Sequence, residues 1–307
     1  MKMDLLIVGS GAMATLFAAR FSAVGVDVTL LGSWLDGLAA LRKTGAQIEG
    51  GDGQCVKVTD KPADCRGAKL ALVLVKSWQT ERSASQLADC LADDGLAVTL
   101  QNGLGNETIL SNALGLQRVA RGVTTIGATQ LAPGIVRFGG EGVITLERHS
   151  RLAALEAMLQ LAKFELSVVE DVEPAVWGKL IVNAAINPLT AILRVKNGEL
   201  LTNPPMRALM GQLAREAGQV AGARMQALPF LDPVHAVEEV AQRTAGNVSS
   251  MLQDVLRGTP TEVDAINGAI VRMGEWAGIP TPVNWTICSL MKAISVRGKI
   301  ENLSGDV

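Results

Sequence analysis

Three polar side chains interrupt a long apolar run in the second half of the sequence. Residues 174–190 read Pro-Ala-Val-Trp-Gly-Lys-Leu-Ile-Val-Asn-Ala-Ala-Ile-Asn-Pro-Leu-Thr, in which Lys179, Asn183 and Asn187 recur at every fourth position. An α-helix has about 3.6 residues per turn, so this spacing predicts one polar stripe on a largely buried helix. A lysine is costly to bury unless it is paired or borders a wet pocket, so the stripe should face a group that needs an ammonium and two amides. Alternatively, the stripe satisfies backbone groups of a neighbouring helix.

Pro188 comes directly after the stripe. Proline has no backbone N–H and its ring crowds the preceding turn, so a kink is predicted beside Asn187. The carbonyl groups freed by this kink would add hydrogen-bond acceptors.

Few other side chains are suited to acid/base chemistry. The two histidines, His149 and His235, lie in polar or turn-like surroundings that favour surface roles. The four cysteines have neither C-x-x-C spacing nor an adjacent histidine, so no metal site and no disulfide framework is predicted. Lysine and carboxylates therefore remain as the acid/base candidates.

The first thirty residues carry the pattern of a dinucleotide-binding unit. A short apolar run, Asp4–Val8, predicts a buried strand of a parallel sheet. Gly-Ser-Gly-Ala-Met-Ala follows at 9–14, then helical spacing over Thr15–Ala23 and a second strand over Gly25–Leu31. Strand, G-x-G-x-x-A loop, helix and strand in this order predict a cofactor site at the loop.

Each small residue of this loop has a physical reason. Gly9 allows the tight turn, Gly11 lets the backbone approach a pyrophosphate, and Ala14 lets helix and strand pack closely. The helix N-terminus would then hold the phosphates. The same loop contributes the remaining expected cofactor contacts, from Ser10, Ala12 and Met13.

The end of the second strand bears on the choice between NADP and NAD. NAD enzymes usually place an acid there, but this strand runs into Gly-Ser-Trp at 32–34 and the first acid is Asp36. A strand end without an acid leaves room for a 2′-phosphate, to which Ser33 could donate and which Arg42 or Lys43 could approach. NADP is therefore favoured, and NAD is not excluded.

Two further strands deliver polar residues to the same predicted edge. Ala68–Val75 is followed by Lys76, and Leu96–Leu100 is followed by Gln101 and Asn102. Ligands of open α/β sheets lie outside the carboxyl ends of the strands, so Lys76 and Asn102 are site candidates. Asn102 also precedes a glycine and has ordinary turn chemistry as an alternative. The remaining elements predicted for this half are strands at Val119–Gly127, Gly142–Glu147 and Leu166–Val169, and a helix at Arg151–Phe164.

From about Glu173 onward helical spacing dominates, which predicts an α-helical second domain. The predicted fold is an α/β Rossmann-type dinucleotide-binding domain over 1–170, then an all-α substrate and catalytic domain over 171–307. Further helices are predicted at Met206–Ala227 and Ala236–Gln253. Thr-Pro-Thr-Glu at 259–262 reads as an N-terminal capping box, which is a sufficient structural reason for Glu262.

The composition of the chain restricts the classes of partner that are expected. The chain has 307 residues, a formal net charge of −2 and no run of five or more Lys or Arg, so neither nucleic acid nor an anionic membrane surface is an expected partner. Charges interrupt every apolar run before the roughly 18 residues that a membrane span needs. The N-terminus reads as a strand and not as a signal peptide, so a cytoplasmic location is expected. A small molecule is the expected partner, and a homodimer is left open.

A nucleotide-binding half joined to a helical half with a buried lysine suggests hydride transfer to a carbonyl. The carbonyl oxygen gains negative charge as hydride arrives at its carbon, so a cation that can also give up a proton stabilises the transition state. Lys179 fits that role. Nearby asparagine and serine side chains can hold the carboxylate and hydroxyl groups of an oxo acid.

Over essentially its whole length the chain resembles the ketopantoate reductase (2-dehydropantoate 2-reductase) family, NADPH-dependent enzymes of pantothenate synthesis. The resemblance rests on the 9–14 loop and on several further motifs. These are Val-Lys-Ser-Trp-Gln at 75–79, Gln-Asn-Gly at 101–103, Trp-Gly-Lys-Leu at 177–180 with Asn183, Asn-Pro-Leu-Thr-Ala at 187–191, Asn-Gly-Glu-Leu at 197–200, Asn-Val-Ser-Ser-Met-Leu-Gln-Asp at 247–254 and Thr-Glu-Val-Asp-Ala-Ile-Asn-Gly at 261–268. Two positions depart from the family pattern: Ser33 stands near the place of a common arginine, and Ala14 replaces a glycine.

The resemblance implies a role for each matching residue. Lys179 would be the proton donor, with Glu262 close to the reacting centre and at the cofactor. The implied substrate ligands are Asn102, Asn183, Asn187, Asn197 and Ser250. Lys76, Asn102 and Ala128 are implied at the cofactor.

Three functions remain to be weighed. The first is reduction of 2-dehydropantoate to (R)-pantoate. The second is reduction of another branched or aromatic 2-oxo acid, as in D-2-hydroxyacid dehydrogenases, because no motif reports the volume of the pocket. The third is a dinucleotide-binding sensor without catalysis, against which the joint presence of lysine, amides, serine and acid argues.

Overall fold

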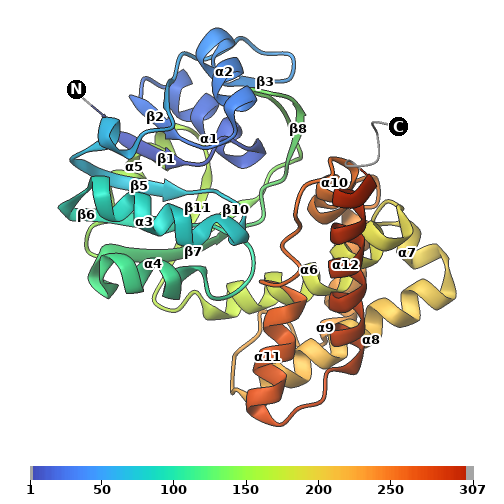
Figure 1. Ribbon diagram of the computed structural model, residues 1–307. Helices are drawn as coiled ribbons and strands as arrows, with labels where there is room; N and C mark the ends of the chain where they lie inside the picture. The colour runs from blue at the N-terminus through green and yellow to red at the C-terminus, as the bar shows by residue number, and fades with distance from the viewer. Residues whose placement is uncertain (1–2, 302–307) are drawn as a thin grey trace. The chain divides into compact units, whose positions relative to one another are not determined.

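The computed structural model describes residues 3–301, the last seven as backbone only. Two compact units make up the chain: residues 1–101 with 105–172, and residues 102–104 with 173–307 (Figure 1). The ends of the two domains predicted from the sequence, residues 1–2 and 302–307, lie outside the described residues. The short segment 102–104 belongs with the second unit although it lies between two elements of the first.

The main sheet of the first unit is built from short apolar runs. Its strands are β1 (Leu5–Val8), β2 (Val28–Leu31), β4 (Lys57–Thr59), β5 (Ala68–Val73), β6 (Leu91–Thr99), β7 (Val119–Thr124), β10 (Val143–Glu147) and β11 (Glu165–Val169). Their order is β11-β10-β7-β6-β5-β1-β2-β4, and neighbours run parallel except for β10 against β7. The strand β1 is fully buried, as expected of a parallel strand covered on both faces.

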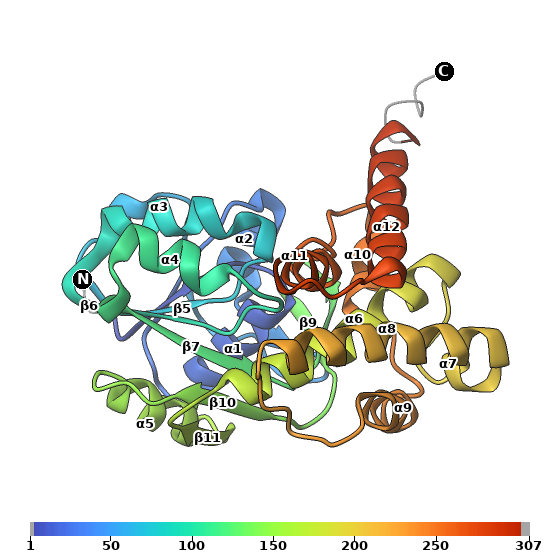
Figure 2. The same cartoon turned by 90° about the horizontal axis from the view of Figure 1, so that it is seen from below.

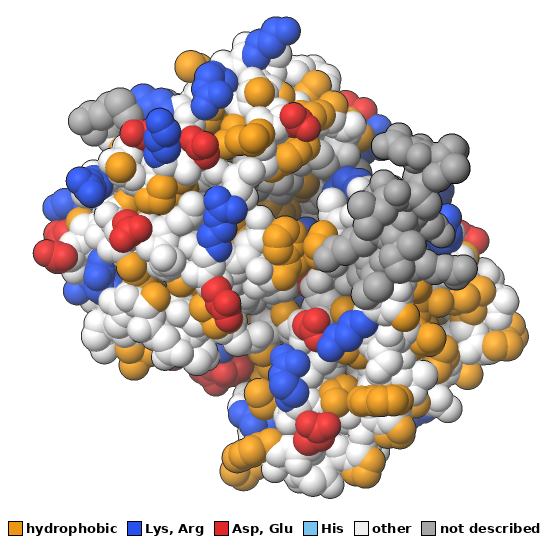
Figure 3. All heavy atoms as spheres, in the orientation of Figure 1, with side chains coloured by type: hydrophobic (Ala, Val, Ile, Leu, Met, Phe, Trp, Pro, Cys, Tyr) orange, Lys and Arg blue, Asp and Glu red, His pale blue; other side chains and the backbone are white. Residues whose placement is uncertain are grey.

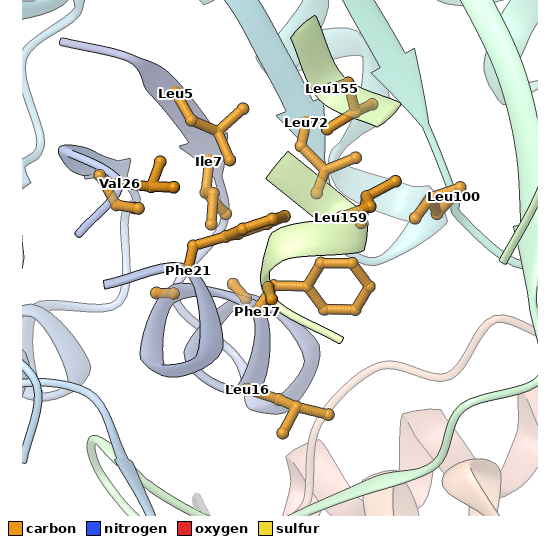
Figure 4. Close-up of a cluster of buried hydrophobic side chains, with 14 of the residues drawn as sticks. Leu5, Ile7, Leu16, Phe17, Phe21, Val26, Leu72, Leu100, Leu155 and Leu159 are labelled. Atoms are coloured by element: carbon orange, nitrogen blue, oxygen red, sulfur yellow. The ribbon is translucent and has the colours of Figure 1, made fainter. Parts of the chain in front are cut away.

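Helices cover this sheet. They are α1 (Ala12–Ala23), α2 (Leu35–Thr44), α3 (Thr80–Cys90), α4 (Asn106–Leu114) and α5 (Ala153–Leu161), with short 3₁₀ turns η1 (Pro62–Cys65), η2 (Ser77–Gln79) and η3 (Leu116–Arg118). On the α1 side, Phe21 lies next to Ile7 of β1, in a buried cluster that also contains Phe17 and Leu5 (Figure 4). Phe17 also stacks on Phe164, with ring centroids 4.5 Å apart. This aromatic cluster fixes α1, and with it the glycine loop, against the sheet.

A second sheet was missed by the sequence analysis. It contains β3 (Gln47–Ile48), β8 (Ala128–Ala132) and β9 (Ile135–Phe138), in the order β3-β9-β8. Strands β8 and β9 form a hairpin whose turn contains Gly134 at φ +76°, a conformation that favours glycine. The predicted strand over 119–127 therefore ends at Thr124, where the chain leaves the main sheet.

The second unit is helical, which confirms the predicted fold class. Its helices are α6 (Glu173–Leu193), α7 (Glu199–Thr202), α8 (Pro204–Ala223), α9 (Pro233–Arg243), α10 (Ser250–Leu256), α11 (Asn267–Ala277) and α12 (Pro282–Glu301). Helix α6 packs against α8, α9, α10 and α12. Figure 2 shows α9 and α12 on opposite sides of α8. Helix α6 has the length and hydropathy of a membrane span, but 72% of its apolar window is buried within the protein, as in the core helix of a soluble protein.

The polar stripe and the proline both belong to α6, which continues through Pro188 to Leu193. Pro188 has no N–H to donate to the carbonyl of Ala184, four residues earlier. That carbonyl instead accepts a hydrogen bond of 2.9 Å from the side chain of Asn267. The acceptor freed by the proline is therefore used by another helix.

Two predictions for the second half were wrong. Residues 236–253 are not one helix: α9 ends at Arg243 and α10 begins at Ser250, because Ser249 caps α10 by accepting from Leu252 N at 3.1 Å. Residues 259–262 are not a capping box either, since the next helix begins only at Asn267. The Glu262 side chain is buried and accepts a hydrogen bond from another segment of the chain.

The surface carries charges of both signs. On the face drawn in Figure 3, Lys and Arg side chains alternate with Asp and Glu. Several surface pairs are close, among them Arg137 with Glu49 and Arg207 with Glu238, both at 2.6 Å. Exposed pairs of this kind contribute little to stability.

Candidate functional site

The glycine loop of the first unit has the geometry that a dinucleotide requires. Gly9 has φ +131°, and a Cβ there would lie 3.2 Å from the backbone of Leu74, so a larger residue is excluded. Gly11 is exposed, and nothing lies within 4 Å of the position where its Cβ would be. The backbone of the loop is therefore open on the side at which a pyrophosphate would approach.

The N-terminus of α1 is suited to hold an anion. Gly11 is its N-cap and offers no side-chain cap, and the first turn holds no acidic residue. The early N–H groups of a twelve-residue helix thus carry the positive end of its dipole without a protein carboxylate. Ala12 and Met13 are half-buried and Ala14 is fully buried, as its packing role requires.

The ends of β1 and β2 lie side by side at this edge. Gly9 N donates to Leu31 O at 2.8 Å, and a Cβ on Gly32 would lie 2.7 Å from the hydroxyl of Ser10. Ser33 follows directly and is half-buried. The exposed Arg42 guanidinium donates to Val58 O at 3.4 Å.

Lys76 is the third residue after β5, whose last residue, Val73, pairs with Val8 of β1. Gln101, which follows β6, donates to Val75 O at 3.1 Å and to the Thr80 hydroxyl at 2.9 Å. These bonds tie the ends of β5 and β6 together and fix the backbone that leads to Lys76 and to residue 102. Ala128 is the first residue of β8, a strand that packs against α1.

Lys179 and Glu262 are two charged groups of the second unit that interact electrostatically. Burial lowers the pKa of the Lys179 amine to about 8, and the neighbouring Glu262 carboxylate opposes that shift. Glu262 has only 5% of its surface exposed. An ammonium with a pKa close to neutral is well matched to donating a proton at physiological pH.

Asn102 joins this pair from a distant part of the sequence. Its side-chain N–H donates to the Glu262 carboxylate at 3.0 Å, although the two residues are 160 positions apart. Leu104 N donates to Ala265 O at 2.9 Å, so residues 102–104 dock on the turn that follows Glu262. Gly103 makes this possible: its φ is +82°, and a Cβ would lie 2.3 Å from Ala265 O.

The other end of the stripe is tied to the start of α10. Asn187 is buried, and its carbonyl accepts from the Thr190 hydroxyl at 2.9 Å. The oxygens of Thr190 and Ser249 are 2.7 Å apart, and Ser249 caps α10. The half-buried Ser250 therefore begins α10 beside Asn187. Asn183 lies between Lys179 and Asn187 on the same helix and is half-buried.

Asn197 lies on the loop after α6 and is buried. Its backbone N–H donates to Asn247 O at 3.1 Å, and its side-chain N–H donates to the Thr244 hydroxyl at 2.9 Å. The side-chain oxygen of Asn197 is buried and has no hydrogen-bond partner among residues 3–301. The predicted site residues of the second unit thus gather along α6, the α9–α10 connection and the turn after Glu262.

Models of one protein family match both halves of the chain. The model described as ketopantoate reductase PanE/ApbA matches residues 5–151, and its C-terminal counterpart matches residues 171–295. The chain belongs to the ketopantoate reductase family. The family resemblance inferred from the sequence motifs is thereby confirmed, and the protein is an oxidoreductase.

Named ketopantoate reductases match over nearly their full length. A 2-dehydropantoate 2-reductase of Archaeoglobus fulgidus is 41% identical over 94% of this chain and 96% of its own. One from Halobacterium salinarum is 33% identical over 94% of this chain and 98% of its own.

Solved structures share the fold. A PanE/ApbA family ketopantoate reductase from Ralstonia eutropha has a TM-score of 0.89 and 32% identity, covering 96% of this chain and 99% of its own. D-Mandelate dehydrogenase, solved with NADH and anilino(oxo)acetate, has a TM-score of 0.87 at 23% identity, covering 96% of this chain and 99% of its own. That second likeness concerns the fold alone.

The sequence analysis missed residues that hold the candidate site in place. Thr190, Ser249 and Asn267 are buried and make the contacts that tie α6 to α10 and α11. The sequence does indicate one of these contacts: Pro188 has no N–H, so the carbonyl of Ala184 needs another donor. The partner of that carbonyl could not be found by periodicity, because Asn267 lies 83 positions away.

Proposed function

We propose that this ketopantoate reductase reduces 2-dehydropantoate to (R)-pantoate with NADPH, in pantothenate and coenzyme A synthesis. The observation that carries the proposal is the half-buried Lys179 near the buried Glu262 carboxylate, which accepts a hydrogen bond from Asn102 at 3.0 Å. Desolvation in this environment lowers the pKa of the amine to about 8. A proton donor with such a pKa suits a reaction that develops an alkoxide. The names of the relatives from Archaeoglobus and Halobacterium support the choice of substrate.

The cofactor would be held by the first unit. The residues suited to its pyrophosphate are those of the glycine loop, since α1 presents uncapped N–H groups there. Ser33, Lys76 and Ala128 would line the rest of its site. When bound, the nicotinamide supplies the hydride that reduces the carbonyl carbon.

The remaining chemistry belongs to side chains of the second unit. Lys179 would hydrogen-bond the carbonyl oxygen of the substrate and give it a proton as negative charge develops there. The Glu262 carboxylate raises the pKa of the Lys179 amine and so favours the protonated form of the amine. Asn102 holds Glu262 through its amide N–H and would contact substrate and cofactor. The carboxylate and hydroxyl groups of the substrate would be bound by Asn183, Asn187, Asn197 and Ser250.

The direct test is NADPH oxidation by the purified protein with 2-dehydropantoate. We expect substrate-dependent oxidation and formation of (R)-pantoate as the product. Absence of turnover with every 2-oxo acid, together with tight NADPH binding, would favour a dinucleotide-binding sensor and contradict the proposal.

A panel of branched and aromatic 2-oxo acids addresses the nearest alternative. The fold is shared with D-mandelate dehydrogenase, so the fold does not choose between these substrates. We expect kcat/KM to be highest for 2-dehydropantoate. A higher kcat/KM for an aromatic 2-oxo acid would replace the substrate and leave the reaction class intact.

A further inference from the structure

The backbone hydrogen bond that Pro188 removes from α6 is replaced by a bond from one side chain. Because Pro188 has no N–H, the Ala184 carbonyl loses its partner in the helix. Asn267, the first residue of α11, donates its side-chain N–H to that carbonyl at 2.9 Å. Ala184 lies between Asn183 and Asn187, so the bridge reaches α6 in the middle of the polar stripe.

The orientation of the Asn267 amide is fixed by its partners. The Ala184 carbonyl can only accept, so the NH₂ group must face it, and the same group donates to the Asn284 side chain at 3.0 Å. Asn284 in turn donates to Leu213 O at 3.2 Å and to the Glu216 carboxylate at 2.9 Å. Both asparagines are fully buried, so solvent does not compete for these bonds.

This asparagine is not the best choice for stability alone. Its side-chain oxygen is buried and has no partner within residues 3–301. A buried acceptor without a partner carries a desolvation cost. The two hydrogen bonds that its NH₂ group donates offset this cost.

A tight turn connects Asn267 to Glu262. The carbonyl of Glu262 accepts from the backbone N–H groups of Ala265 and Ile266, both at 3.1 Å, and Gly268 N donates to Val263 O at 2.9 Å. Glu262 and Asn267 are thus the two ends of one hydrogen-bonded turn. The hydrogen bond from Asn267 to the Ala184 carbonyl therefore attaches the end of this turn to α6.

We propose that Asn267 is a positioning residue of the reductase: by occupying the carbonyl that Pro188 frees, it sets the Glu262 carboxylate opposite the Lys179 amine. The inference deepens the proposed function and rests on it. Asn267 itself touches neither substrate nor cofactor in this account; it acts through Glu262.

The test compares Asn267→Ala with the control Val237→Ala. Val237 is a fully buried residue of α9 outside the candidate site. If Glu262 moves away from Lys179, burial still lowers the pKa of the amine and the opposing effect of Glu262 weakens. We therefore expect Asn267→Ala to lower kcat about 10- to 100-fold. We also expect it to shift the alkaline limb of the kcat profile to lower pH by about half a unit or more.

Val237→Ala should lose stability without shifting that limb. An alkaline limb in Asn267→Ala that superimposes on the wild-type limb would overturn the proposal.

A double-mutant cycle with Pro188→Ala tests the bridge itself. Alanine at 188 supplies the N–H that the Ala184 carbonyl lacks, so the donor from Asn267 becomes dispensable. In the double variant we expect thermal stability to recover toward that of Pro188→Ala alone, because the Ala184 carbonyl has a donor again. The alkaline limb should stay shifted, because the turn that follows Glu262 still lacks its side-chain bond to α6. Strict additivity of the two substitutions in melting temperature would contradict the bridge. If Asn267→Ala alone fails to fold, a folded double variant supports the bridge and an unfolded double variant contradicts it.

The two proposals fail in different ways. If the wild-type protein does not reduce 2-dehydropantoate, the proposed function fails, but the melting temperatures of the cycle still report on the bridge. If the wild type is active and Asn267→Ala differs from it only in stability, the proposed function stands and the positioning role is wrong.

Discussion

Among single residues, the Lys179 amine has the environment that matters most for the proposed reaction. Burial lowers its pKa to about 8, while the Glu262 carboxylate keeps it from falling further. Near pH 7 most of the amine is protonated, yet its proton is much easier to transfer than that of a solvated lysine. The same side chain can therefore bind a carbonyl oxygen and protonate it.

The pH dependence of turnover follows from this pKa. If protonated Lys179 is the acid, kcat for reduction is constant below its pKa and falls as the pH rises through about 8. We expect Glu262→Gln to move that fall to lower pH, since the opposing charge is removed. Steady-state kcat measured from pH 6 to pH 10 in both proteins is the check. A fall that moves to higher pH in Glu262→Gln would contradict the assignment.

Ser33 is expected to set the cofactor preference. No acid stands at the end of β2, and Arg42 is engaged with Val58 O. The wild type should bind NADPH more tightly than NADH, and Ser33→Arg should widen this preference by about 10-fold through a charge-assisted bond to the 2′-phosphate. Titration of both cofactors against both proteins measures it. Equal affinity of the wild type for NADH and NADPH would contradict the expectation that the end of β2, which lacks an acid, favours NADP.

At the scale of elements, regular structure could be predicted and irregular segments could not. Apolar runs and the glycine fingerprint correctly indicated β1, α1, β2 and the helical second half, because burial imposes a period on those segments. The hairpin of β8 and β9 was missed, since half-buried strands carry a weaker pattern. Glu262 was assigned to a capping box from local spacing, whereas its environment is set by residues 102–104 and by α6.

Gly103 and Gly105 offer a matched test of one such irregular segment. Both have positive φ, but a Cβ on Gly103 would lie 2.3 Å from Ala265 O, whereas nothing lies within 4 Å of that position on Gly105. Each Gly→Ala change should cost about 1–2 kcal/mol from the backbone conformation. Only Gly103→Ala should also displace Asn102 from Glu262, with a fall in kcat/KM of about 10-fold or more. Equal kcat/KM in the two variants would contradict this role of residues 102–104.

In the molecule as a whole, the groups suited to a dinucleotide and the groups suited to proton transfer belong to different units. The first has the loop, helix terminus and strand ends that suit a dinucleotide, and the second gathers the lysine, the acid and the amides. Family motifs in the sequence named most of these residues. The contacts that hold them, such as Asn102 with Glu262 and Ala184 with Asn267, join positions far apart in sequence. No periodicity reports such pairs, and only the folded chain reveals them.

Cofactor binding should stabilise the whole chain by mass action. NADPH at 100 times its Kd is expected to add about 2.7 kcal/mol to the free energy of unfolding. Gly11→Asp would place a carboxylate at the N-terminus of α1, where the phosphates are expected, and should abolish that stabilisation. Melting temperatures with and without NADPH measure the effect. Unchanged stabilisation in Gly11→Asp would place the cofactor elsewhere.

The most direct test of the central claim is kcat of Lys179→Ala for the reduction of 2-dehydropantoate at pH 7, measured beside an NADPH titration. Loss of a positioned acid predicts a kcat lower by about 10² to 10⁴-fold, with the Kd for NADPH unchanged. A Lys179→Ala protein that turns over at the wild-type rate would contradict the claim that this amine delivers the proton.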